Sequence, residues 1–285
     1  MAHKVAVVTD STAYLEPGDA EALGIHVVPL QIQMGSEKFL DGIEIDSEEL
    51  FRRLTLGAPI AKSLPPNPRT FEKLYSKLHG ETDQILSIHI SRLLSKTIQT
   101  AKMGADPLLG RCNIEVVDSM TTSVGLGILV KAAAQAANDG ADLEEIVRLV
   151  RGMLPHIYLI FYVETMDYLE RGERIGKAQA ILGTMLNIKP ILFMEDGDII
   201  PLEKVRTTEK ALEKLFEFVT EFDNLEQTAI IQRSVEPGKE ARILKERLVQ
   251  NFPDMDFPVV QYGPDLATRI GPNALGVVVY EGMTF

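Results

Sequence analysis

The chain has 285 residues, of which 29 are lysine or arginine and 41 are aspartate or glutamate, so its net charge is -12. This length allows two domains and a sizeable hydrophobic core. The negative charge, with no run of basic residues, argues against a nucleic-acid partner.

Cysteine and histidine usage limits the chemistry further. The single cysteine, Cys112, cannot form a disulfide within the chain, and the five histidines lack metal-ligand spacing. No apolar run reaches the roughly 18 residues that a membrane-spanning helix needs, and the N-terminus lacks the pattern of a signal peptide. We therefore expect a cytoplasmic protein with no metal and no stable membrane insertion.

The first half of the chain alternates strand-like and helix-like segments. The expected strands are 4–9, 26–31, 84–89 and 114–117, and the expected helices are 16–23, 47–56, 69–78, 95–105, 122–138 and 143–153. Such alternation predicts a parallel sheet with helices on both faces. We assign it to an α/β domain at residues 1–155. The proline-rich segment 58–68 is expected to be a loop or lid without regular structure.

Polar residues follow three of the expected strands, at 10–12, 91–97 and 118–123. Helix capping accounts for any one of these hydroxyls, since Ser, Thr and Asp are preferred N-cap residues. Ligands of parallel sheets bind beyond the carboxyl ends of the strands, where helix N-termini attract anions. Together, these residues predict a site for an anionic headgroup.

The second half has a different pattern. A strand at 156–163 precedes a hairpin formed by 191–194 and 199–206, with its turn at 195–198. Helices are expected at 207–222 and 237–251, and strands at 228–232, 259–262 and 276–280. The hairpin predicts an α+β domain at residues 156–285 with a mainly antiparallel sheet.

The least generic stretch is 168–192. Arg171, Arg174 and Lys177 recur at three-residue spacing around two glycines, and the apolar run 178–188 predicts a helix that ends before Lys189-Pro190. Exposed charges alone could explain these cations.

This stretch resembles the motif of the DegV family of bacterial fatty-acid-binding proteins, roughly Leu-x-Tyr-Leu-x-x-Gly-Gly-Arg-Ile-Gly followed by Leu-x-Ile-Lys-Pro-Ile-Leu. Further similar motifs lie at 63–71, 91–99 and 267–276. The chain departs from the family pattern where Glu173 replaces a glycine, Arg92 a serine, Lys96 a glycine and Arg269 a histidine.

The resemblance implies a two-domain DegV-like fold that holds a long-chain fatty acid, such as palmitate, in an apolar tunnel between the domains. It implies a carrier without catalytic residues or a cofactor other than the bound fatty acid. It also implies a partner, a separate fatty acid kinase subunit that phosphorylates the carboxylate. The residues implied for the ligand are Ser63, Ser91, Arg92, Ser95, Thr268, Arg269 and Arg174, and those for the partner are Arg171 and Arg206.

Two alternatives remain open. The added cations Arg92, Lys96 and Arg269 could select a more highly charged lipid, such as an acyl phosphate or a phospholipid, because arginine binds phosphate through paired hydrogen bonds. A stand-alone hydrolase or phosphotransferase could use Asp10 or Asp118 as its base.

Overall fold

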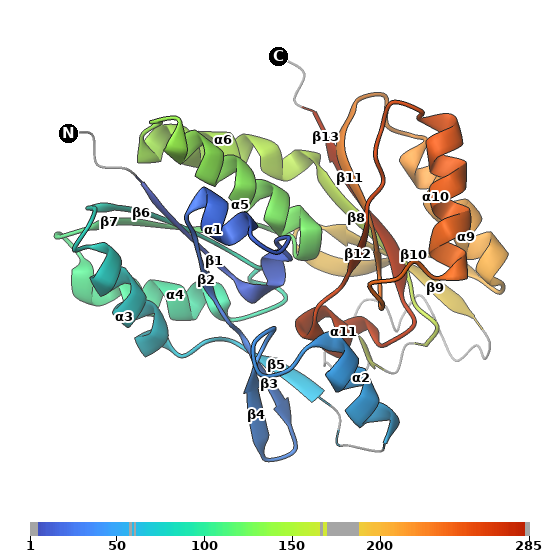
Figure 1. The fold of residues 1–285 in the computed structure, drawn as a ribbon, viewed down its shortest axis with the longest axis horizontal. Helices are drawn as coiled ribbons and strands as arrows, with labels where there is room; N and C mark the ends of the chain where they lie inside the picture. The colour runs from blue at the N-terminus through green and yellow to red at the C-terminus, as the bar shows by residue number, and fades with distance from the viewer. Residues whose placement is uncertain (1–4, 57–58, 60, 166–167, 170–187, 283–285) are drawn as a thin grey trace.

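The structure is a computed structural model that describes residues 5–56, 59, 61–165, 168–169 and 188–282. Two large sheets lie side by side, with a small sheet below them (Figure 1). Helix α5, Ser123–Asn138, packs against strands of both large sheets. Among the described residues, no helix combines the length and the apolar character needed to cross a bilayer.

The first sheet is parallel throughout, as the alternating pattern predicts. Its strand order is β2-β1-β6-β7. The strands are β1 Ala6–Asp10, β2 Ile25–Val28, β6 Gln84–His89 and β7 Asn113–Asp118. Successive β1 residues point to opposite faces, so Val7 packs in the core that contains α5 while Val8 packs in a second core with Phe71 and Ala101.

Helices cover both faces of this sheet, which confirms that part of the prediction. The helices of the first half are α1 Asp19–Leu23, α2 Ser47–Thr55, α3 Pro68–Leu78, α4 Thr97–Ala105, α5 Ser123–Asn138 and α6 Leu143–Met153. Residues of α3 and α4 pack on one face, and residues of α5 and α6 pack on the other.

A small antiparallel sheet corrects the expectation for residues 58–68. Its order is β4-β3-β5, with β3 Gln31–Met34, β4 Glu37–Leu40 and β5 Ala61–Leu64. The expectation of no regular structure at 58–68 was wrong because the prolines flank the four residues of β5 and leave its N–H groups able to pair.

The second sheet is mixed, with order β10-β9-β8-β13-β11-β12, and its one parallel pair is β11 with β12. Its strands are β8 Ile157–Tyr162, β9 Lys189–Glu195, β10 Asp198–Val205, β11 Leu225–Gln232, β12 Val259–Gln261 and β13 Leu275–Glu281. The predicted hairpin is confirmed as β9 and β10. Helices α9 Thr208–Val219 and α10 Lys239–Asn251 pack in the core on one face.

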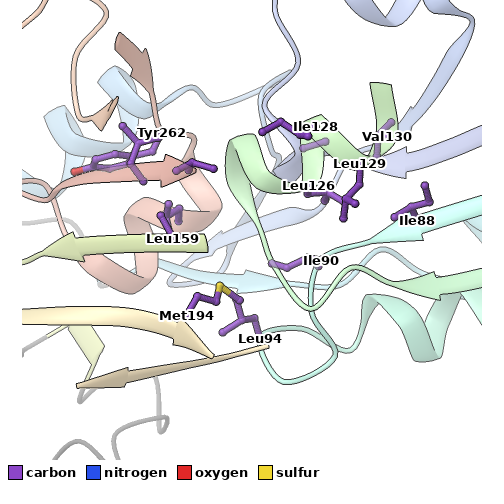
Figure 2. Packing of buried hydrophobic residues seen from close by; sticks show 14 of the residues in the cluster. Ile88, Ile90, Leu94, Leu126, Ile128, Leu129, Val130, Leu159, Met194 and Tyr262 are labelled. Carbon is purple, nitrogen blue, oxygen red and sulfur yellow. The ribbon is translucent and has the colours of Figure 1, made fainter. Parts of the chain in front are cut away.

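Helix α11, Pro264–Ile270, is an element that the sequence analysis did not predict. Its signals were present, since Pro264 occupies the first turn and Gly271 ends the helix with a φ of 78°. The main core joins the two halves through α5, with residues from the first sheet, α5, β8 and β9 in one cluster (Figure 2).

Candidate headgroup site

Asp10 ties together two loops at the carboxyl end of the first sheet. Its carboxylate accepts hydrogen bonds from the backbone N–H of Thr12 at 3.0 Å, the Thr12 hydroxyl at 2.6 Å and the backbone N–H of Ile90 at 3.0 Å. Nδ1 of His89 lies 2.9 Å from the same carboxylate. Asp10 is fully buried. These hydrogen bonds fix the backbone just after β1 and just after β6.

A series of buried polar side chains, linked by hydrogen bonds, extends from Asp10 through His89. Nε2 of His89 lies 2.7 Å from the Ser87 hydroxyl, which lies 2.8 Å from the Tyr75 hydroxyl. Burial raises the pKa of Tyr75 well above its ordinary value. Because Asp10 is enclosed and already accepts several hydrogen bonds, it is poorly placed to take a proton from a substrate.

Asp118 is the other base considered from the sequence, and its carboxylate also accepts hydrogen bonds from the backbone. Its Oδ1 accepts from the N–H of Met120 at 3.0 Å and the N–H of Arg92 at 3.3 Å. Its Oδ2 lies 3.5 Å from the Arg92 guanidinium, whose side chain is 72% exposed. Arg92 therefore extends into solvent rather than toward Arg269.

Ser91 joins the two large sheets. Its hydroxyl donates to the backbone carbonyl of Gly197, in the β9–β10 turn, at 2.6 Å, and it accepts from the N–H of Leu93 at 3.2 Å. The hydroxyl of Ser95, four residues on, lies 2.8 Å from that of Thr97. Both serines are buried, so this loop is held firmly against the second sheet.

Arg269 is enclosed by partners on α11 and on the Ser91–Ser95 loop. Its Nε and Nη2 donate to the two carboxylate oxygens of Asp265 at 3.0 and 2.8 Å, and its Nη1 donates to the Leu94 carbonyl at 2.8 Å. Thr268 donates its hydroxyl to the Asp265 carbonyl at 2.7 Å. The pair is buried, so the positive charge that Arg269 adds is balanced by Asp265.

Ser63 has a different status. Its hydroxyl is buried on β5 and has no hydrogen-bond partner in the part of the chain that the structure describes. Strand β5 packs against α11, which carries Thr268 and Arg269. The structure thus brings Ser63, Thr268, Arg269 and the Ser91–Ser95 loop to one region.

The remaining predicted residues lie elsewhere. Arg206 follows β10 and is exposed. Arg171 and Arg174 lie outside the described residues, as does all but the last residue of the helix expected at 178–188.

The sequence analysis missed Asp41, which lies in the same region and is buried. Its Oδ2 accepts from the Ser11 hydroxyl at 2.7 Å, and Ser11 accepts from the N–H of Leu30 at 3.0 Å. Burial and the charge of Asp265 raise the pKa of Asp41 to about 8. An aspartate before a glycine has the local signature of a turn, so only the fold shows that the charge of Asp265 on α11 acts on Asp41.

Tyr14 belongs to the same cluster. Burial and the charges of Asp41 and Asp265 raise the pKa of Tyr14 well above its ordinary value. Ring atoms of Tyr14 also approach Gly263, where a Cβ would come within 2.5 Å of the ring. The region therefore combines carboxyl, hydroxyl and guanidinium groups with little exposure to water.

A fold of two sheets around a shared helix has clear counterparts among known proteins. Residues 4–282 match the family described as "Uncharacterised protein, DegV family". A DegV domain-containing protein of Streptomyces coelicolor is 36% identical, covering 98% of this chain and 99% of its own. The chain therefore belongs to the DegV family.

Solved structures agree with that assignment. A DegV family protein of Thermus thermophilus, described as fatty acid binding, has a TM-score of 0.89 and 29% identity, and the match covers 98% of this chain and 100% of that chain. DegV of Bacillus subtilis, described as a fatty acid binding protein, has a TM-score of 0.87 and 28% identity with the same coverage. Within the described residues, no group of three or more His, Cys, Asp or Glu side chains could hold a metal ion.

Proposed function

We propose that this protein is a non-catalytic carrier that binds a long-chain fatty acid between its two domains, 1–155 and 156–285, and presents the carboxylate to a separate kinase subunit. The observation that carries the proposal is the full-length likeness to the two DegV proteins described as fatty acid binding. The apolar core shared by the two halves is consistent with an acyl chain lying there.

The energetics of such a complex are favourable. Burying about 14 methylenes at about 0.8 kcal/mol each contributes a gross stabilisation of about 11 kcal/mol, before the costs of ordering and association. Hydrogen bonds to the carboxylate then fix its orientation. For a carboxylate beside α11, Ser63 offers a hydroxyl that has no partner among the described residues. The guanidinium of Arg269 has five N–H donors, of which Asp265 and Leu94 take three in the same part of the chain.

The charge balance supports a headgroup with one negative charge over a more highly charged lipid. Arg269 is paired with Asp265, Arg92 with Asp118, and Lys96 is exposed. The sequence suggested that Arg92, Lys96 and Arg269 together make the site strongly positive. Because of their ion pairs and exposure, their charges do not combine in this way. The enclosed, hydrogen-bonded state of Asp10 likewise disfavours the hydrolase alternative.

The proposal is tested by titrating the protein with palmitate and comparing Ser63→Ala with wild type. A hydrogen bond to a charged group contributes about 1.5 to 3 kcal/mol, so we expect affinity to fall about tenfold or more. The stability of the ligand-free variant should not fall, because the lost hydroxyl bonds to none of the residues that the structure describes.

Ser76→Ala on the exposed face of α3 is the matched control, and it should bind as wild type does. Wild-type protein that shows no saturable binding of palmitate or of longer and shorter fatty acids would contradict the proposal. Equal affinity of Ser63→Ala and wild type would remove Ser63 from the site.

A further inference from the structure

Asp41 occupies a buried position at the boundary between the small sheet and α11. It follows β4, its N–H donates to the Leu30 carbonyl at 2.9 Å, and it forms an isolated β-bridge with Ile45. Its side chain is 2% exposed. The backbone bonds on both sides leave the carboxyl group little freedom to turn toward water.

The groups that face Asp41 come from several elements. Ser11 of the turn after β1 donates to it, and Asp10 at the end of β1 acts on it through its charge. From α11, Asp265 acts on it with like charge and Arg269 with opposite charge. Tyr14 follows that turn, and the charge of Asp41 contributes to the raised pKa of Tyr14.

Arg269 cannot balance both acids of this cluster. Two of its nitrogens bind the carboxylate of Asp265, and the third binds the Leu94 carbonyl. With Asp41 protonated, the group of Asp41, Asp265 and Arg269 is neutral. With Asp41 ionised, the group carries one net negative charge in a buried region, where charges interact strongly.

We infer that Asp41 sets the charge of the headgroup site: in its protonated form it admits an anionic headgroup, and in its ionised form it repels one. This rests on the proposed function, because it takes the ligand's carboxylate to lie beside Ser63 and α11. Burial and the negative charges of Asp265 and Asp10 bring the pKa of Asp41 to about 8, against the opposing effects of Ser11 and Arg269. The change of charge then falls at mildly alkaline pH.

Palmitate binding measured between pH 6.5 and pH 9.5 tests the inference. When binding requires one bound proton, affinity falls about tenfold for each pH unit above the pKa, so wild type should weaken in this way above about pH 8. Asp41→Asn keeps the shape of the protonated acid and cannot ionise, so its affinity should stay level. Asp254→Asn, at an exposed position, should follow wild type.

The outcomes separate this inference from the proposed function. Two results would overturn the role of Asp41 and leave the fatty-acid function standing. In one, the palmitate affinity of wild type stays constant up to pH 9.5. In the other, the affinity of Asp41→Asn falls with pH as that of wild type does. No palmitate binding at any pH by any of the three proteins contradicts the proposed function and this inference with it.

A second variant keeps the test decisive if Asp41→Asn does not fold. Ser11→Ala removes a hydrogen bond that favours the ionised form of Asp41. The alkaline loss of palmitate affinity should therefore move to higher pH in Ser11→Ala. A profile that stays in place, or moves to lower pH, overturns the inference.

Discussion

Asp10 and Asp41 are buried carboxyl groups in the same part of the molecule, but their surroundings differ. Asp10 accepts two backbone N–H bonds and a hydroxyl bond, and it also contacts His89. Asp41 has one hydroxyl donor in Ser11 and faces the charge of Asp265. The first arrangement suits an acceptor that organises backbone, and the second suits an acid that keeps its proton.

The raised pKa of Asp41 makes folding stability depend on pH. In the unfolded chain the group releases its proton near its ordinary value of 3.8, whereas in the folded protein it keeps the proton up to about pH 8. Its contribution to stability is therefore complete below about pH 4 and is lost progressively as the pH rises to about 8. Above that pH the loss is constant.

We predict that Asp41→Asn becomes more stable relative to wild type as the pH rises within this window. The difference in unfolding free energy should grow by about 1.4 kcal/mol per pH unit. Urea denaturation at pH 5, 6 and 7 measures it, with Asp254→Asn as the control. A difference that is constant across the three pH values would show that Asp41 ionises normally.

At the scale of elements, the hairpin of β9 and β10 reaches the first sheet through its turn. Asp196 and Gly197 both have positive φ, as a two-residue turn of this kind requires. The Gly197 carbonyl accepts the Ser91 hydroxyl bond, and a Cβ on Gly197 would lie 2.5 Å from the Ser91 oxygen. The turn therefore positions the loop that carries three predicted site residues, Ser91, Arg92 and Ser95.

We predict that Gly197→Ala destabilises the protein by about 2 kcal/mol more than Gly140→Ala. Both glycines have similar positive φ, 85° and 93°, so the cost of the backbone conformation is shared. Gly140 has open space around it, whereas the change at Gly197 also disturbs a buried hydrogen bond. Equal losses, measured as unfolding free energies in urea, would show that the contact with Ser91 contributes little.

Periodicity predicted most elements because their apolar residues face one large core. Helix α6 matches its expected bounds, and β6 does so as well. It missed β3 and β4, where a single strand at 26–31 was expected, and it missed β5 and α11. The last two are short and lie where prolines and glycines suggest turns. Their structure depends on partners distant in the chain, namely β3 for β5, and β5 and α2 for α11.

The candidate site, like the fold, could be predicted from the sequence only in part. Motifs predicted Ser63, Ser91, Ser95, Thr268 and Arg269 as ligand residues, and the fold brings these five residues to one region. They could not show that Asp265 lies against Arg269 with paired bonds, or that Asp41 reaches the same cluster from 30 residues beyond Ser11. Charge balance in a buried site depends on such contacts, so it could not be read from residue types alone.

At the scale of the whole molecule, the proposal separates a lipid site from a partner surface. Arg206 is exposed after β10, whereas Asp265 and Arg269 form a buried ion pair. We predict that Arg206→Glu abolishes acyl phosphate formation when a fatty acid kinase subunit is supplied, because the reversed charge repels the partner. Palmitate affinity should remain unchanged.

The matched control is Arg111→Glu, an exposed arginine in the turn before β7, at the opposite end of that strand from Asp118. It should leave acyl phosphate formation intact. Loss of palmitate binding in Arg206→Glu would place this residue in the lipid site, and full acyl phosphate formation would remove it from the partner surface.

Fatty acid binding can be tested without adding any ligand, by identifying the small molecule that co-purifies with the protein. Denaturing the purified protein and analysing the extract by mass spectrometry should yield a fatty acid in near-equal molar amount, because a buried acyl chain dissociates slowly. The chain length would follow from the mass. An extract without lipid, from protein that also gains no thermal stability with added fatty acid, would show that the protein is not a fatty acid carrier.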